Sequence, residues 1–336
     1  MGENKKSVSD IIIERIIKDV DETGEIFWQR PYQSYSAFNW YTKRPYMGIN
    51  RILLPYDEYL TYNQFKEFAK TNKGKNYKWV EGSKWFYVVF YKDYDKQVYR
   101  KAFEDLDLGI SYDSFVAEDG NKRKVKGVII FSKNGKAYRK SFMLRYTRVT
   151  SRTSFVDEEG KPLPSRVEND EVEIVRYDAK AIIDDYIDRE NLNVNYEWAD
   201  TPCYIESLDT VCLNKHTVNE EAWFSTAFHE LSHSTGSKNR LDRQSMRDYT
   251  KSKEIRAIEE CVAEISASML CAECNIHNFE TSESFAYKNN IAYVKSWKKR
   301  IQDWGGEFIN IVKQAEIASL MILDRLGEDT EEKIEN

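Results

Sequence analysis

The sequence predicts an α+β protein of two domains, a β-rich mixed N-terminal domain and a mainly helical C-terminal domain. Short alternating apolar runs separated by turn residues dominate the first half, and helical spacing dominates the second. Charge divides the chain in the same way, because residues 1–150 hold 28 basic and 19 acidic residues, a balance of +9, whereas the remainder holds 22 and 37, or −15. A polar stretch with a glycine and two prolines separates the halves. We therefore expect domains at 1–150 and 171–328, a linker at 151–170 and an acidic tail at 329–336.

In the N-terminal half the apolar spacing predicts one helix at the start, with Ser9 or Asp10 as its N-cap. The dipeptide Asn134-Gly135 between two β-like runs is a hairpin signal. The elements predicted here are helices at 7–20 and 62–70 and strands at 84–92, 127–131 and 141–149.

The C-terminal half predicts helices joined by short connections, with little strand. Its one β-like region, Cys203–Leu213, predicts two short strands. The helical stretches are 179–191, 221–234, 253–272 and most of 285–324, and Gly236 lies where a helix stop is expected.

Composition excludes a membrane protein. Charged residues make up 32% of the chain and mean hydropathy is −0.68, and the longest apolar runs are far too short to span a bilayer. The first residues lack the apolar stretch of a signal peptide. The five cysteines are odd in number and scattered, and Cys271 and Cys274 have no second pair with which to form a zinc ribbon. We expect reduced thiols in a cytoplasmic protein.

The most informative motif is His229-Glu-Leu-Ser-His233. Residues four apart lie on one face of a helix, so the two imidazoles can bind one metal ion. Glu230 can then reach a water molecule held by that metal, as in H-E-x-x-H zinc peptidases. The chain has only four histidines, and two of them fall in this motif. Zn²⁺ is the expected ion, with Mn²⁺ or Co²⁺ as alternatives.

A third ligand is expected from the helix at 253–272, where Glu260 and Glu264 share one face of an otherwise apolar surface. The spacing resembles the gluzincin pattern, which implies that Glu260 binds the metal and that Glu264 orients a ligand histidine through its free ring nitrogen. The reverse assignment of these two carboxylates is also open. The adjacent Glu259 is expected to be a solvated helix residue.

The basic half interleaves Tyr, Trp and Phe with Lys and Arg. Stacking of bases on aromatic rings in a cationic groove is a general way to hold single-stranded nucleic acid, although any one aromatic is more often a core residue. The candidate DNA contacts are Trp28, Arg30, Trp40, Tyr41, Lys43, Arg44, Tyr46, Asn50, Lys84 and Trp85.

Several motifs, in order, resemble those of ArdC-type antirestriction proteins. Asn39–Asn50 resembles the N-terminal signature of that family, and His229–Gly236 with Arg240–Arg243 resembles its H-E-L-x-H-x-T-G and R-L-x-R segments. Glu259–Glu264 and Tyr293–Trp297 resemble two further family motifs. The resemblance implies an N-terminal domain that binds single-stranded DNA, a C-terminal zincin-like metallopeptidase domain, and carriage by plasmids, phages and other mobile elements.

Together these patterns predict that Glu230 acts as a general base in peptide hydrolysis, with Tyr293 or His216 stabilising the developing oxyanion. A host protein such as a restriction component would be the substrate. The rival hypothesis is a non-catalytic protein that protects single-stranded DNA by occupancy and has a structural or vestigial metal site. A nuclease is disfavoured, because no acidic cluster of the kind that holds Mg²⁺ is visible in the sequence.

Overall fold

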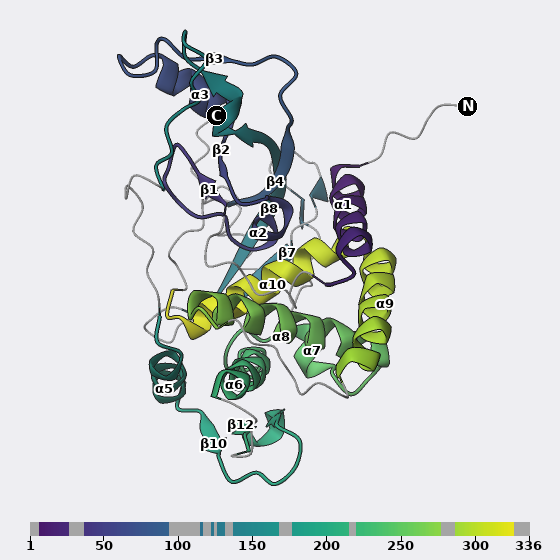
Figure 1. The fold of residues 1–336 in the computed structure, drawn as a ribbon. Coiled ribbons are helices and arrows are strands. Elements are labelled where there is room, and N and C mark those ends of the chain that lie inside the picture. Colours follow the sequence, from purple (N-terminus) through teal and green to yellow (C-terminus); the bar gives the residue numbers. More distant parts are fainter. Residues whose placement is uncertain are drawn as a thin grey trace, which may run out of the picture.

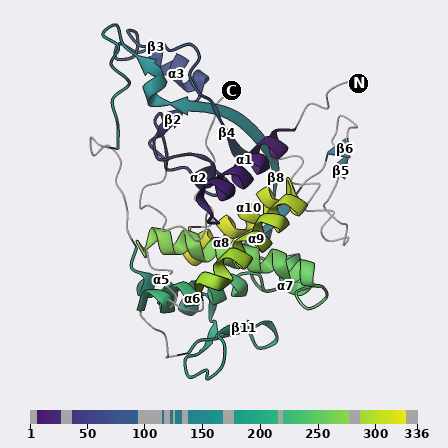
Figure 2. The same ribbon diagram turned by 45° about the vertical axis from the view of Figure 1, so that its right-hand side comes forward.

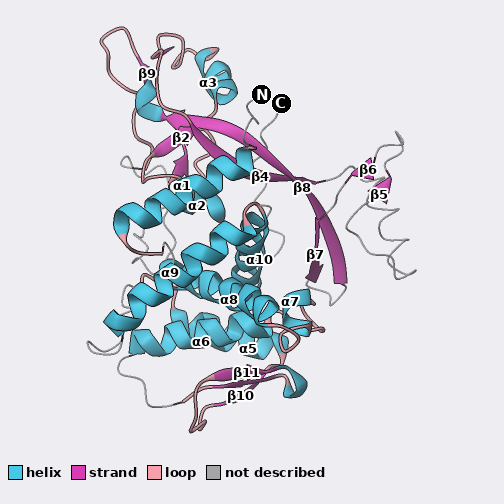
Figure 3. Ribbon diagram, turned by 90° about the vertical axis from the view of Figure 1, so that its right-hand side faces the viewer, coloured by secondary structure: helices cyan, strands magenta, loops and turns pink. Residues whose placement is uncertain are grey.

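The computed structural model describes residues 7–26, 37–93, 115–116, 122–123, 126–131, 137–167, 177–214, 220–276 and 286–325. The fold is mixed α+β, as predicted. Strands β1 to β4 lie toward one end of the molecule, and the helices from α5 onward form the other end with a small sheet beneath them (Figure 1). Strand β7 and the adjoining part of β8 extend beside the helical part (Figure 3).

Helix α1 (Val8–Thr23) begins one residue before the predicted cap residues. Ser7 is the N-cap, because its hydroxyl accepts a hydrogen bond from the backbone of Asp10 while the Asp10 side chain accepts one from the backbone of Ser7. The helix ends at Gly24, whose φ of 73° is the left-handed conformation that glycine adopts without strain. One face, formed by Ile12, Ile13, Ile16 and Val20, is buried.

The large sheet has the order β1-β2-β8-β4, with β7 also paired to β8. Its strands are β1 (Phe38–Asn39), β2 (Glu58–Leu60), β4 (Phe86–Asp93), β7 (Lys126–Phe131) and β8 (Ala137–Ser151). The predicted hairpin pairing is confirmed, since β7 and β8 pair antiparallel, while the turn at Asn134-Gly135 lies outside the described residues. Strand β8 runs longer than the predicted 141–149, because it pairs with β7 along its first part and with β4 along the rest. A separate ladder joins β5 (Phe115–Val116) and β6 (Lys122–Arg123). Helices α2 (Ile49–Leu53) and α3 (Tyr62–Ala69) complete this part.

The predicted linker at 151–170 is wrong over its described residues, because 151–167 belongs to the N-terminal fold. After the turn η2 (Arg152–Ser154), strand β9 (Phe155–Val156) pairs antiparallel with β3 (Lys78–Trp79). Phe155 and Leu163 are fully buried in a cluster with Trp40, Leu60 and Phe65. Gly160 lies in a turn between these buried residues, Pro162 forms an antiparallel bridge with Val156, and the carbonyl of Pro164 accepts a hydrogen bond from Trp40.

The C-terminal part begins with α5 (Ala179–Glu190), followed by a small sheet of order β10-β12-β11. Its strands are β10 (Asn193–Asn195), β11 (Cys203–Ile205) and β12 (Thr210–Cys212), with the turn η3 (Glu206–Leu208) between the last two. The helices that follow are α6 (Glu220–Ser234), α7 (Gln244–Arg247), α8 (Lys253–Glu273), α9 (Ala286–Trp304) and α10 (Glu307–Ile322), and Figure 2 shows α8, α9 and α10 crossing above α6. Among the described residues, no helix combines the length and apolar character needed to cross a membrane.

One apolar core joins the two halves. Residues of α1, α2 and β4 pack in a single cluster with residues of α8, α9 and α10, and Figure 3 shows α1 and α2 between the large sheet and the helical layer. The guanidinium of Arg51 on α2 lies 3.2 Å from the carboxylate of Glu273 at the end of α8. The helix that contributes acidic residues to the metal centre is therefore packed directly against the N-terminal fold.

Candidate metal centre

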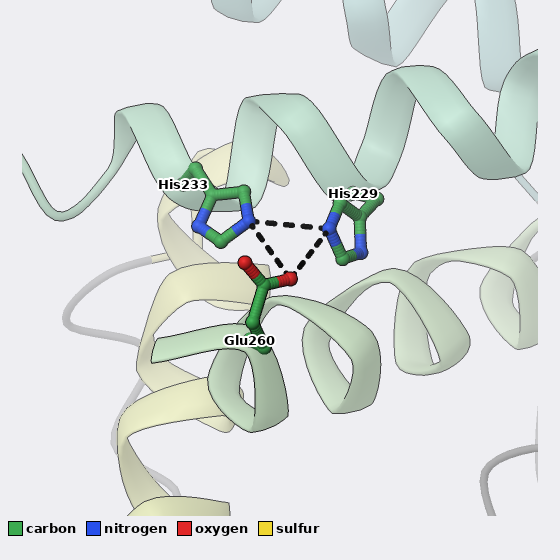
Figure 4. Close-up of side chains that lie close together, drawn as sticks. All are labelled: His229, His233 and Glu260. Atoms are coloured by element: carbon green, nitrogen blue, oxygen red, sulfur yellow. Dashed lines mark hydrogen bonds and ion pairs between the residues drawn. The ribbon is translucent and has the colours of Figure 1, made fainter. Parts of the chain in front are cut away.

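Two packed helices bring three metal-binding side chains together. His229 and His233 lie one turn apart on α6, and Glu260 approaches them from α8 (Figure 4). The Nε2 atoms of the two histidines are 3.1 Å apart. The Oε2 atom of Glu260 lies 3.5 Å from Nε2 of His229 and 3.7 Å from Nε2 of His233. The three donor atoms thus form a compact triangle.

This triangle has the dimensions of one face of a tetrahedral metal site. A divalent ion bound through two imidazole nitrogens and a carboxylate oxygen at about 2.1 Å holds its donors roughly 3.4 Å apart. The observed separations of 3.1, 3.5 and 3.7 Å surround that value. Two imidazoles and one carboxylate also suit zinc and other first-row divalent ions. The residues present therefore fit a metal ion.

Glu259 lies behind His233 and is wholly buried, so the expectation of a solvated residue is wrong. Its Oε1 atom is 3.3 Å from Nδ1 of His233, while its Oε2 atom accepts hydrogen bonds from Arg243 Nε at 3.1 Å and Ser245 Oγ at 2.6 Å. Burial by itself would raise the pKa of Glu259, but Arg243 and His233 outweigh it and lower the pKa to about 2. Glu259 is therefore an anion that accepts the Nδ1–H of His233 and leaves Nε2 free for a metal.

Glu264, which was expected to orient a ligand histidine, is not part of the donor group. It is half-buried one helical turn beyond Glu260, or about 6 Å further along the axis of α8. Burial and, to a smaller extent, the nearby Glu264 carboxylate raise the pKa of Cys261. Near the beginning of α8, Glu259 and Glu260 face the histidines, and further along α6 continues to pack against α8, where Ser232 donates a hydrogen bond to Ser266.

Tyr249, in the connection between α7 and α8, is a site residue that the sequence did not reveal. Its hydroxyl donates a hydrogen bond to Oε1 of Glu260, the carboxylate oxygen farther from the histidines. Its ring centroid is 6.1 Å from that of His233. Burial and Glu260 raise the pKa of Tyr249 above its usual range, so the phenol remains a donor. No spacing rule connects Tyr249 with the motif helices, so only the fold identifies it.

Glu230 points away from bulk water, with 7% of its surface exposed. Burial raises its pKa, the two histidines oppose that rise, and Glu260 adds to it. A hydrogen bond with the backbone of Tyr204 on β11 also acts on its carboxylate. A carboxylate with a raised pKa beside three metal-ligand candidates suits the acceptance of a proton near neutral pH.

Two buried arginines fix the segment after α6. Arg240 is 2% exposed and pairs with Asp209 at 2.7 Å and Glu190 at 3.2 Å. Arg243 passes over Gly236, where a Cβ atom would lie 2.6 Å from its Nη2 atom. The glycine predicted as a helix stop follows the last residue of α6 by two positions, and the lack of a side chain there makes room for the arginine that holds Glu259.

The two residues proposed for the oxyanion cannot be placed. Tyr293 lies on α9, but its side chain is outside the described part of the structure, and His216 is outside the described residues altogether.

The predicted DNA contacts divide into three groups. Trp28 and Arg30 lie outside the described residues. Trp40 and Tyr46 are core residues with 1% and 3% exposure, so the prediction that they stack on bases is wrong. The Trp40 indole donates to the carbonyl of Pro164 at 2.8 Å, and Tyr46 packs against Tyr59.

Asn50 is also structural, because both ends of its amide bond the backbone of Val89 on β4, at 2.5 and 2.7 Å. The remaining candidates reach the surface: Tyr41, Lys43, Arg44 and Lys84 are exposed and Trp85 is half-buried.

Comparisons with known proteins match both parts of the chain. The N-terminal domain of anti-restriction factor ArdC matches residues 6–138, and a zincin-like metallopeptidase family matches residues 181–309. Two Escherichia coli proteins named DNA primase TraC are 25% and 24% identical over 94% of this chain. The chain spans 20% and 27% of the length of those primases.

The fold is similar to crystal structures of the antirestriction protein ArdC from plasmid R388. The metal-free structure has a TM-score of 0.59 and the Mn(II)-bound structure one of 0.60, each at 19% sequence identity. The match covers 96% of this chain and 99% or 100% of the other.

Proposed function

We propose that this chain, which is an ArdC-type protein with an ArdC N-terminal domain followed by a zincin-like domain, is an antirestriction protein of a mobile genetic element. It binds single-stranded DNA through its N-terminal part and hydrolyses a peptide bond at the centre formed by α6 and α8. It acts in the cytoplasm of the cell that receives the element, and a host protein such as a restriction component is its substrate.

The observation that carries the proposal is the grouping of His229, His233 and Glu260 beside the buried Glu230. Catalytic zinc sites use three protein ligands, whereas structural sites are closed by a fourth. Within the described residues, the donor group contains three members. A structural site also has no need of a general base, so a buried Glu230 next to the ligands favours hydrolysis over a purely structural role.

The side chains divide the work of hydrolysis. A divalent ion, Zn²⁺ in this proposal, would supply Lewis acidity and lower the pKa of a water molecule. Glu230 accepts the proton of that water and delivers it to the leaving amine. Glu259 keeps His233 in the tautomer that presents Nε2, and Tyr249 holds the outer oxygen of Glu260 so that its inner oxygen faces the histidines.

A peptide is the substrate class that the surroundings of the centre favour. Strand β11 lies at one side of its sheet, paired to β12 alone among the described strands. Its residue Tyr204 contacts Glu230 through the backbone. An extended peptide can add to such an edge by main-chain hydrogen bonds, which would bring a carbonyl to the metal centre without a dedicated side-chain pocket.

The decisive variant is Glu230→Gln, compared with wild type in three assays. We expect it to keep its metal and its affinity for single-stranded DNA but to lose protection of unmodified DNA transferred into a restricting host. A non-restricting host is the control for transfer itself. Full protection by the variant would contradict hydrolysis and support the alternative, in which the protein shields single strands by occupancy and the metal site is structural.

A further inference from the structure

One segment of the N-terminal fold has a charge opposite to that of the chain. Residues 62–85 hold six lysines and two glutamates, whereas the whole chain has a net charge of −6. All six lysines, Lys66, Lys70, Lys73, Lys75, Lys78 and Lys84, are exposed. The segment contains α3, β3 and the approach to β4, which lie together at one end of the molecule (Figure 1).

Three aromatic rings lie in a row on this segment. Tyr62 is 42% exposed, and its ring centroid is 6.1 Å from that of Trp79. Trp79 is in turn 5.7 Å from Trp85, with the two rings tilted by 43°. Both indoles are half-buried. Tyr62, Trp79 and Trp85, together with the six lysines, are called the aromatic–lysine surface below.

These rings differ from an aromatic residue of the core. Trp40 is 1% exposed and its indole N–H donates to a backbone carbonyl, whereas the indole N–H of Trp79 is buried and finds no hydrogen-bond partner among the described residues. Leaving such a donor unpaired costs stability. Trp79 also keeps part of its surface exposed, unlike Trp40.

We propose that the aromatic–lysine surface is the binding platform for single-stranded DNA. The inference rests on the proposed function, which assigns such binding to the N-terminal part but not to particular residues. The lysines attract the phosphate backbone, and the aromatic row offers ring surface to successive unpaired bases. The Nζ atom of Lys66 lies over the Tyr62 ring, 4.8 Å from its centre, and places a positive charge on one face of this aromatic residue.

The combination of aromatic rings and exposed lysines favours single-stranded DNA over other polyanions. A duplex keeps its bases stacked on one another and could use the lysines only, and an acidic peptide has no flat bases to cover the rings. The metal centre on α6 and α8 lies in the opposite part of the molecule (Figures 1 and 3). Binding on this surface is therefore expected to be separable from metal binding by mutation.

The stacking part is tested with Tyr62→Ala in the full-length protein, using fluorescence anisotropy with a labelled 20-nucleotide oligo-dT. Loss of one stacked base weakens binding roughly 5- to 150-fold. Tyr196→Ala is the matched control, because Tyr196 is 40% exposed and its ring lies 6.4 Å from another tryptophan, Trp223, outside the surface. Equal loss in the two variants, or none in Tyr62→Ala, would overturn the proposal.

The charge part is tested by the salt dependence of the same binding. Replacing Lys66, Lys73 and Lys84 by Gln lowers the slope of log affinity against log salt by about 2, since each lost phosphate contact on a single strand contributes about 0.7. The exposed lysines Lys18, Lys180 and Lys299, on other helices, form the control triple. An unchanged slope in the Lys66, Lys73 and Lys84 variant would contradict the assignment.

The wild-type measurement distinguishes an error in the proposed binding surface from an error in the proposed function. If wild-type protein binds oligo-dT and all variants bind equally well, the platform is wrong and DNA binding belongs elsewhere on the molecule. If wild type does not bind oligo-dT at all, both the DNA-binding part of the proposed function and the proposed binding surface are contradicted. A duplex of the same length that competes as well as oligo-dT would refute the stacking role.

Discussion

The Oε1 atom of Glu259 lies 3.3 Å from Nδ1 of His233, on the side of the ring opposite the Nε2 atom that faces His229 and Glu260. The guanidinium of Arg243 forms an ion pair with the same carboxylate. Adjacent residues of one helix thus have different tasks, since Glu260 presents an oxygen to the metal position and Glu259 fixes the imidazole beside it. In the metal-free protein, Glu259 and Glu260 together outweigh burial and raise the pKa of His233, so metal binding must displace a proton.

The first prediction concerns Glu259. Replacing it with Gln removes the anion that accepts the Nδ1–H of His233, and we expect metal affinity to fall about 10- to 100-fold. Isothermal titration with Zn²⁺ measures the change. Glu264→Gln is the control, because Glu264 lies on the same helix but outside the donor group. A larger effect in Glu264→Gln than in Glu259→Gln would restore the assignment expected from the sequence.

The second prediction concerns Tyr249. Tyr249→Phe keeps the ring beside His233 but removes the hydrogen bond to Glu260. Since hydrogen bonds to charged groups contribute about 1.5–3 kcal/mol, we expect metal affinity to fall about tenfold or more, and the free energy of unfolding of the metal-free protein to fall as well, because this bond is present without the metal. The same titration, with chemical denaturation alongside, tests this. Unchanged affinity would mean that Glu260 is oriented without the phenol.

The third prediction concerns Gly236. In Gly236→Ala the added Cβ would meet Arg243 Nη2 at 2.6 Å and Met246 Cβ at 2.9 Å. We expect a loss of about 1–3 kcal/mol in the free energy of unfolding, as for other overpacked sites. Gly306→Ala is a milder comparison, because its Cβ would approach only the Ser9 side chain, at 3.3 Å. Urea unfolding of both variants measures the difference, and equal stability would exclude a steric role for Gly236.

The fourth prediction concerns the pH dependence of stability through Asp209. Burial by itself raises the pKa of Asp209, but hydrogen bonds from Arg240 and Tyr204 outweigh it and lower the pKa below its usual value. A carboxylate with a lowered pKa stabilises the fold above its unfolded pKa of about 3.9, and that contribution is lost as pH falls further. Asp209→Asn should therefore be less stable than wild type at pH 7, with the gap narrowing below about pH 4. A gap that widens on acidification would contradict the sign.

Local patterns predicted the elements and the histidine pair, because spacing along one helix fixes which side chains share a face. The choice among Glu259, Glu260 and Glu264 depends on where α6 crosses α8, which no local pattern contains. The same applies to Tyr249, which reaches Glu260 from a connection between helices.

In the N-terminal half, local sequence likewise does not determine which aromatic residues are buried. Trp40 and Tyr62 both lie in Lys- and Tyr-rich sequence, yet one is in the core and the other is exposed. The turn residues around Phe155 and Leu163 predict a linker. The two side chains instead fill one buried cluster, together with residues that are distant in sequence. Burial of a single aromatic or aliphatic residue is decided by long-range packing, and sequence periodicity over so few residues does not determine it.

The presence of a metal at His229, His233 and Glu260 can be measured directly as metal content. Wild-type protein, purified without added metal, would be analysed by mass spectrometry beside His229→Ala, Glu260→Ala and Glu230→Gln. We expect about one equivalent of a divalent metal in wild type and in Glu230→Gln, with loss in the two ligand variants. Absence of metal from wild type, even after incubation with Zn²⁺ and Mn²⁺, or full retention by His229→Ala, would contradict a metal centre formed by His229, His233 and Glu260.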